Sequence, residues 1–231
     1  MLQIIGLILL SGLALWFLGR HSLRVLGPAP TLPMAGLAVA LFILTALCGA
    51  SAYWLKMAIA QESYVLNTQL NLSQAGLKIW EVLRGVLTEE LLLRGALLYL
   101  LMTKWGNRRA IILTSVLFGV LHWLNGGVWG NLVQMVIVFL YTFLMGLVLA
   151  YSFVQTRTIW MPIAIHFGWN LTEQFIFPGS AGNEHMFIMQ GVPPEVTVSY
   201  SAYFFMLLFP KFSALGLNFF LLKRFKAADG Q

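Results

Sequence analysis

Long apolar stretches separated by short polar segments run through the whole chain. A membrane-spanning helix needs ~17–25 predominantly apolar residues. Such helices are expected at residues 2–18, 34–55, 80–103, 110–124, 132–154, 159–177 and 200–222. The first run lacks a basic leading region and a small-residue cleavage site, so we expect a retained helix and not a signal peptide. The pattern predicts an all-α fold: a polytopic membrane helix bundle of about seven transmembrane helices, forming one domain over residues 1–231.

Composition supports the membrane assignment. Hydrophobic residues make up 59% of the chain and charged residues 10%, whereas a soluble domain carries about 25% charged residues. The net charge of +6 does not indicate nucleic-acid binding, because most Lys and Arg residues stand at the ends of apolar runs. The single cysteine, Cys48, excludes an intrachain disulfide and a cysteine metal cluster.

The distribution of basic residues predicts the orientation of the helices. Basic clusters follow the first, third, fifth and seventh apolar runs, and the segments after the other runs hold few basic residues. Since short cytoplasmic loops carry the excess of Lys and Arg, we expect the amino terminus outside and the carboxyl terminus in the cytoplasm.

A cluster of charges interrupts the third apolar run. Glu89, Glu90 and Arg94 lie in a segment that is otherwise apolar, and each charge at the bilayer centre costs at least ~2.5–3.5 kcal/mol. Glu90 and Arg94 are four residues apart, so they share a helix face and are expected to form an ion pair. Glu89 is rotated by ~100° and faces elsewhere. An ionisable group inside the membrane marks a functional site by default.

Two later runs contribute further polar groups. Phe118 and His122 are four residues apart in one run, and His166 and Asn170 are four apart in another. At a rise of ~1.5 Å per residue, Glu89 and His122 each lie ~20–22 Å from the basic turn that joins their helices. His166 and Asn170 come out at ~13 and ~20 Å from Arg157, somewhat lower but within side-chain reach. The bundle is therefore expected to hold a central polar site.

These residue types indicate hydrolysis but leave its form open. A carboxylate with an imidazole can activate water as a general base, and His166 with Asn170 can stabilise an oxyanion. We find neither a Gly-x-Ser-x-Gly nor a His-Glu-x-x-His motif. Glu89, His122 and His166 could also bind zinc across the helices, and spacing alone does not separate metal-activated water from glutamate-activated water. A non-catalytic peptide-binding or immunity protein and a proton-coupled transporter are the alternatives; no inverted repeat supports the transporter.

Three motifs carry a resemblance to a known family. Glu-Glu-x-x-x-Arg (Glu89, Glu90, Arg94), Phe-x-x-x-His (Phe118, His122) and His-x-x-x-Asn (His166, Asn170) occur in this order on separate apolar runs. Together they resemble the CAAX protease and bacteriocin-processing family of intramembrane endopeptidases. The similarity covers about residues 88–170, inside a motif-bearing core of about 80–177.

The resemblance implies roles for these residues. Glu89 would be the catalytic carboxylate, His122 its partner in activating water, and His166 with Asn170 the oxyanion donors. Glu90 and Arg94 would form a supporting ion pair, and no metal would be obligatory. The short loops resemble those of bacterial members, which implies a multi-pass protein of the bacterial inner membrane acting on a membrane-anchored or lipidated peptide or protein. Nothing in the sequence specifies an oligomeric state.

A few polar features outside the motifs have weaker interpretations. Glu173 could support the site or lie at the membrane interface, and His21 and His185 are expected to be solvated in loops. Segments 125–130 and 178–198 are both placed on the outer side, where they are candidate gates for substrate entry.

Overall fold

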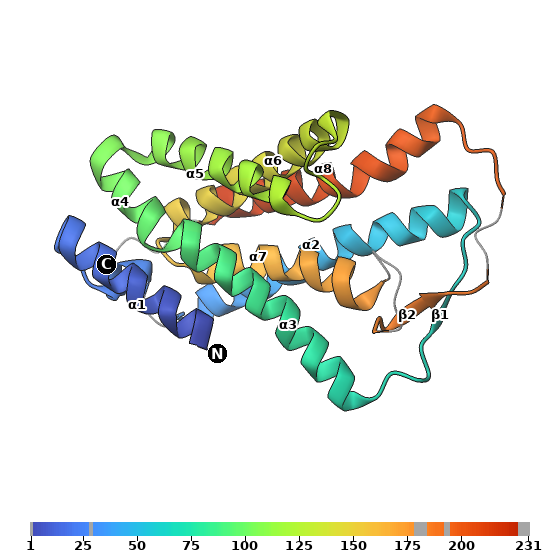
Figure 1. Ribbon diagram of the computed structural model, residues 1–231, viewed down its shortest axis with the longest axis horizontal. Coiled ribbons are helices and arrows are strands. Elements are labelled where there is room, and N and C mark those ends of the chain that lie inside the picture. The colour runs from blue at the N-terminus through green and yellow to red at the C-terminus, as the bar shows by residue number, and fades with distance from the viewer. Residues whose placement is uncertain (1, 28–29, 178–183, 192–194, 226–231) are drawn as a thin grey trace. The chain divides into compact units, whose positions relative to one another are not determined.

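The computed structural model describes residues 2–27, 30–177, 184–191 and 195–225, and most of them are helical. The helices follow one another along the chain as Figure 1 shows. They are α1 (Leu2–Gly19), α2 (Leu32–Ile59), α3 (Leu72–Glu90), α4 (Ala96–Trp105), α5 (Asn107–Leu121), α6 (Leu132–Thr156), α7 (Trp160–Leu171) and α8 (Tyr200–Arg224). The prediction of an all-α helical membrane bundle is confirmed.

Helices α3 and α4 are parts of one longer, continuous helical rod. A π-helical turn, Leu91–Gly95, joins the end of α3 directly to the start of α4. With this joint counted, the described part of the chain contains seven helical rods, in agreement with the predicted number. A second π-helical turn, Thr172–Ile176, extends α7. Short π-helical insertions in α-helices are frequent at functional sites.

Short elements occupy some of the connections. Leu23–Leu26 and His122–Leu124 are 3₁₀ turns. Strands β1 (Tyr64–Leu66) and β2 (Phe187–Met189) form an antiparallel pair, with Val65 opposite Ile188. This ribbon was not predicted, because a strand of three residues is too short to show an alternating pattern.

Not every rod is long and apolar enough to span a membrane by simple criteria. Four described helices meet them: α1, α2, α6 and α8. The rods that carry the three motifs, α3–α4, α5 and α7, do not. Helices α4, α5 and α7 have 10, 15 and 12 residues, which is shorter than the ~17–25 residues of a spanning helix. Helix α3 has 19 residues, and its charged side chains lower its hydropathy.

The chain divides into two compact units. The first unit comprises residues 1–38, 87–164 and 219–231, and the second comprises 39–86 and 165–218. Because this division records which segments pack together and not independent folding, the single-domain organisation stays a prediction.

In the first unit, α5 packs against both α4 and α6, and α1 packs against α4. Its apolar core is formed by Leu15, Leu26, Ala96, Leu98, Met102, Ala110, Ala150 and Phe153. Helices α5 and α6 lie side by side in Figure 1. They approach closely at Gly146, where a Cβ atom would lie 3.0 Å from the Cα of Ser115. Small residues allow such close packing of membrane helices.

In the second unit, α2 and α7 pack closely against each other. A Cβ atom on Gly168 would lie 2.5 Å from the backbone oxygen of Phe42. Asn218 of α8 donates a hydrogen bond of 2.8 Å to the buried Thr45 hydroxyl of α2. Side-chain hydrogen bonds of this kind connect helices in apolar surroundings.

One loop prediction is wrong. His185 is only 4% exposed and not solvated. Its backbone oxygen accepts a hydrogen bond of 3.1 Å from the side chain of Asn67. The backbone N–H of Asn67 donates a second hydrogen bond, of 2.9 Å, to the backbone oxygen of the next residue, Met186. The β ribbon therefore draws this loop into the second unit. Of the candidate gate at 178–198, residues 178–183 and 192–194 lie outside the described part of the chain.

Candidate active site

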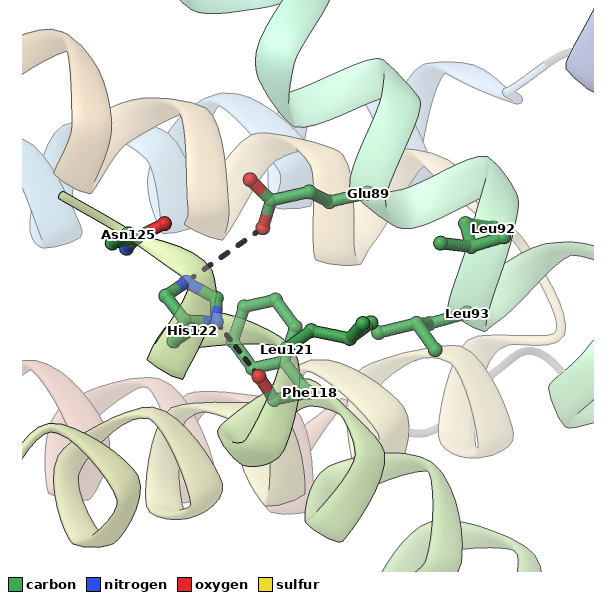
Figure 2. A pocket seen from close by; sticks show the side chains of 7 residues that line it. All are labelled: Glu89, Leu92, Leu93, Phe118, Leu121, His122 and Asn125. Carbon is green, nitrogen blue, oxygen red and sulfur yellow. Dashed lines mark hydrogen bonds and ion pairs between the residues drawn. The ribbon is translucent and has the colours of Figure 1, made fainter. Parts of the chain in front are cut away.

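Glu89 and His122 face each other in the first unit. Glu89 is the penultimate residue of α3, and His122 begins the 3₁₀ turn that ends α5. The Oε2 atom of Glu89 lies 3.8 Å from Nε2 of His122, and Figure 2 shows the carboxylate directed at the ring. This distance exceeds that of a direct hydrogen bond. It is suited to a charge interaction, or to one water molecule that contacts both groups.

A backbone contact fixes the orientation of the His122 ring. Its Nδ1 atom lies 2.7 Å from the backbone oxygen of Phe118, one turn earlier on α5. A carbonyl oxygen can only accept a hydrogen bond, so Nδ1 carries the hydrogen. In the neutral imidazole, Nε2 is then the acceptor atom of the ring, and it lies on the side that faces Glu89 (Figure 2).

The predicted ion pair between Glu90 and Arg94 is present and completely buried. Nη1 of Arg94 lies 3.2 Å from Oε1 of Glu90, and both side chains are 0% exposed. Nη2 of Arg94 donates a hydrogen bond of 3.4 Å to the backbone oxygen of Gly146 on α6. The charges that are expensive in an apolar surrounding are thus paired and hydrogen bonded.

Phe118 connects the ion pair to the histidine. Its ring lies 4.3 Å from Cζ of Arg94, in a cation–π contact. The same ring packs edge-on against His122, with 4.4 Å between the ring centroids. Glu90, Arg94, Phe118 and His122 therefore form a continuous chain of contacts that leads from the buried ion pair to the pair formed by Glu89 and His122.

A pocket opens beside this chain of contacts. It has a volume of about 130 Å³ and is lined by Glu89, Leu92, Leu93, Phe118, Leu121, His122 and Asn125. Apart from the two facing groups and Asn125, the walls are apolar. The volume is sufficient for several water molecules, each of which needs roughly 30 Å³ in the liquid. An acid–base pair in a small apolar pocket can take a proton from water.

The other predicted pair lies in the second unit. His166 is 4% exposed, and its Nε2 atom lies 3.2 Å from Nδ2 of Asn170, one turn later on α7. The two predicted oxyanion donors are therefore adjacent to each other. Each unit holds one half of the predicted site, and the convergence of the two halves on a single reaction centre stays a prediction.

Glu173 lies in the π turn that follows α7. The hydroxyl of Tyr53 is hydrogen bonded to it, and the ammonium groups of Lys56 and Lys211 are near enough to interact with its charge. Glu173 thus belongs to a charged group of the second unit.

Sequence reasoning did not find two contributors to the pocket and its surroundings. Asn125 follows His122 by three residues, a spacing that keeps both on one side of a helical turn, and this was the available signal. The backbone oxygen of Gly146 supports Arg94 from 52 residues away. A main-chain contact of this kind leaves no signal in the sequence.

No group of three or more His, Cys, Asp or Glu side chains among the described residues is arranged to hold a metal ion. Glu89 and His122 would be two of the ligands in the predicted zinc alternative, with His166 of the second unit as the third. The dependence of the protein on a metal stays open to experiment.

The fold and the pocket define a class of protein: a multi-pass helical membrane protein with a carboxylate and an imidazole facing each other in an apolar cavity. Residues 72–172 match the family model described as Type II CAAX prenyl endopeptidase Rce1-like, and all three motifs lie within this segment. This match supports the resemblance of the motif-bearing segment to the CAAX protease and bacteriocin-processing family. At the level of the family, the match supports a CAAX-type intramembrane protease. No curated protein and no solved structure matches the chain significantly.

Proposed function

We propose that the protein is an endopeptidase in which Glu89 and His122 activate a water molecule within the membrane. The observation that carries this proposal is the facing pair at 3.8 Å on the wall of the pocket, with Nδ1 of His122 bound to a backbone oxygen. That bond leaves Nε2 of the neutral ring as an acceptor. A water molecule in the pocket then has two acceptors, the carboxylate and the imidazole.

The reaction proceeds through two proton transfers. As the water oxygen bonds to the carbonyl carbon of the scissile peptide, one of its protons moves to Glu89. His122 accepts a hydrogen bond from the other hydrogen and orients the water. Glu89 then returns the proton to the amide nitrogen as the carbon–nitrogen bond breaks. The products are a carboxylic acid and an amine, and the enzyme regains its starting state.

The remaining motif residues have supporting roles in this proposal. The ion pair of Glu90 and Arg94 stabilises the π turn next to Glu89. Phe118 packs against both Arg94 and His122, so it helps to fix the position of the imidazole ring. His166 and Asn170 would donate to the oxyanion, each contributing on the order of 3–4 kcal/mol. The substrate would be a membrane-anchored or lipidated protein, and the location a bacterial inner membrane.

The proposal is tested with purified protein in liposomes and two peptides that end in a CAAX sequence, one farnesylated and one not. Replacement of Glu89 by Gln or of His122 by Asn should lower kcat by ~10²–10⁴-fold, because each removes a proton acceptor from the water. Glu81→Gln is the matched control, since this exposed carboxylate forms an ion pair with Lys78 and does not line the pocket. Normal cleavage by the first two variants contradicts the mechanism. If the wild type binds a peptide but never cleaves it, the non-catalytic alternative is correct.

The zinc alternative has its own test. Elemental analysis of active protein, followed by assays after chelation, should show activity without bound zinc. Loss of activity on chelation and recovery on adding zinc would replace the metal-free mechanism with a metal-dependent one.

A further inference from the structure

Besides the donors expected from His166 and Asn170, the pocket itself can provide a hydrogen-bond donor to the substrate. If water is activated between Glu89 and His122, the attacked carbonyl group lies in the same pocket. Its oxygen becomes negatively charged in the transition state, and enzymes place N–H or O–H donors at this position. The residues that line the pocket are known, so the donors among them can be identified by elimination.

Most lining side chains cannot donate. Leu92, Leu93, Leu121 and Phe118 are apolar, and an ionised Glu89 only accepts hydrogen bonds. The Nδ1–H group of His122 is directed to the backbone oxygen of Phe118, and Nε2 of the neutral ring is an acceptor. Among the lining side chains, this leaves the carboxamide of Asn125, which has two N–H donors on Nδ2.

The backbone around Asn125 is fixed by the turn in which it lies. Its N–H group donates to the backbone oxygen of His122 at 3.2 Å, and its own carbonyl accepts from Val128 at 3.2 Å. These two bonds set the start of the Asn125 side chain one turn after His122. Figure 2 shows the Asn125 side chain beside the imidazole, with its carboxamide oxygen, and not its nitrogen, drawn on the side of Glu89. Rotation of the carboxamide about its terminal torsion, which has a broad and roughly two-fold preference, exchanges the two atoms and brings Nδ2 to that side.

We propose that the Nδ2 group of Asn125 donates a hydrogen bond to the oxygen of the scissile carbonyl, and so stabilises the oxyanion from the same unit that holds Glu89 and His122. This inference rests on the proposed function. It adds a donor to the pocket and requires no role for Asn125 in folding, because its side chain is exposed.

The experiment compares kcat and KM of Asn125→Ala, Asn125→Asp, Asn125→Gln and wild type on the farnesylated CAAX peptide. Loss of one oxyanion donor lowers kcat by ~10²–10³-fold in known enzymes, and we expect a loss of about this size for Ala and for Asp with KM little changed. The Gln variant retains the donor on a longer side chain and should recover part of the activity.

Asn131→Ala is the matched control. Asn131 lies in the same loop, where its Oδ1 atom accepts from the backbone N–H of Gln134 at the start of α6, and it does not line the pocket. This variant should keep the wild-type kcat while its melting temperature falls. For Asn125→Ala we expect the reverse, an unchanged melting temperature with a reduced kcat.

Several results would overturn the inference. They are a wild-type kcat for Asn125→Ala, an increase in KM alone, or an equal loss of kcat for Asn131→Ala. If any of these occurs while Glu89→Gln is inactive, the Asn125 assignment fails and the proposed function stands. If Glu89→Gln also cleaves normally, the proposed function fails and the role of Asn125 fails with it.

Discussion

Glu90 and Arg94 are fully buried, and each side chain neutralises the charge of the other. Removal of one partner from a buried pair is far more destabilising than replacement of both, because it leaves a charge without compensation. The stability of the first unit should therefore depend on the pair and not on either residue alone.

Arg94→Met should lower the free energy of unfolding by ~3–5 kcal/mol, because it leaves the Glu90 carboxylate buried alone. The double variant Glu90→Gln with Arg94→Met should be less destabilised than the single variant, since no charge remains. Denaturation in detergent micelles measures both changes. Glu81→Gln, which removes an exposed pair with Lys78, is the control and should change stability by at most about 1 kcal/mol.

A double variant that is as unstable as Arg94→Met, or a single variant as stable as the wild type, would contradict this account of the ion pair.

At the scale of residues, the sequence predicts partners that are close along the chain. The four-residue spacing of Glu90 and Arg94, and that of Phe118 and His122, fixes their neighbourhood in any helix. The same reasoning found Glu89 and His122, because charged and imidazole groups are rare in apolar runs. It missed Asn125, which lies in a polar loop where an asparagine is unremarkable.

At the scale of elements, the close packing of α5 and α6 places the Gly146 carbonyl next to Arg94. Here the crossing is tight at the backbone: a Cβ atom on Gly146 would meet the Cα atom of Ser115 at 3.0 Å. A backbone atom cannot move aside as the end of a flexible side chain can. The helices themselves would have to separate.

Gly146→Ala should therefore destabilise the protein by ~1–3 kcal/mol, as overpacking of a tight interface does. It should also reduce activity, because the carbonyl that holds Arg94 is displaced. Gly36→Ala is the control: this glycine lies within α2 with nothing within 4 Å of the added Cβ. That variant should be as stable as the wild type or more stable by ~0.4–1 kcal/mol. Unfolding and cleavage assays on both variants check this, and an unaffected Gly146→Ala protein would show that the crossing is not tight.

The extents of most helices follow closely from the sequence, but α3 begins at Leu72, eight residues before the predicted start at position 80, because its first turns are polar. The irregular turns were not predicted. Hydropathy finds the helices because each apolar run is long and ends in charged or glycine-rich segments. The two π turns, Leu91–Gly95 and Thr172–Ile176, depend on how their side chains pack, which a hydropathy pattern does not record. The pairing of β1 with β2 joins residues more than 120 positions apart, and neither strand alone carries a signal.

At the scale of the whole molecule, the helices that are suited to span a membrane differ from those that carry the site residues. The four that meet simple criteria for a membrane span carry none of the three motifs. The motifs lie on α3, α5, α7 and the turns that extend them; α5 and α7 are too short to meet these criteria, and α3 carries several charged residues. Non-helical or irregular backbone inside a membrane is tolerated where protein or a cavity surrounds it.

The orientation of the chain in the membrane is predicted from its charges. In a Cys48→Ser background, a cysteine at position 126, in the loop after α5, should react with a membrane-impermeant maleimide added to the outside of spheroplasts. A cysteine at position 107, next to the basic residues Arg108 and Arg109, should react only after permeabilisation, because short basic loops remain in the cytoplasm. The opposite labelling pattern would invert the proposed topology.

The central claim is that Glu89 and His122 act together on one water molecule. The most direct test is a double-mutant cycle on kcat with Glu89→Gln, His122→Asn and the combination of both. Residues that act as a unit show strongly non-additive losses, so the account predicts that the double variant is no slower than the slower single variant. Losses that multiply, or a single variant that retains wild-type kcat, would contradict it.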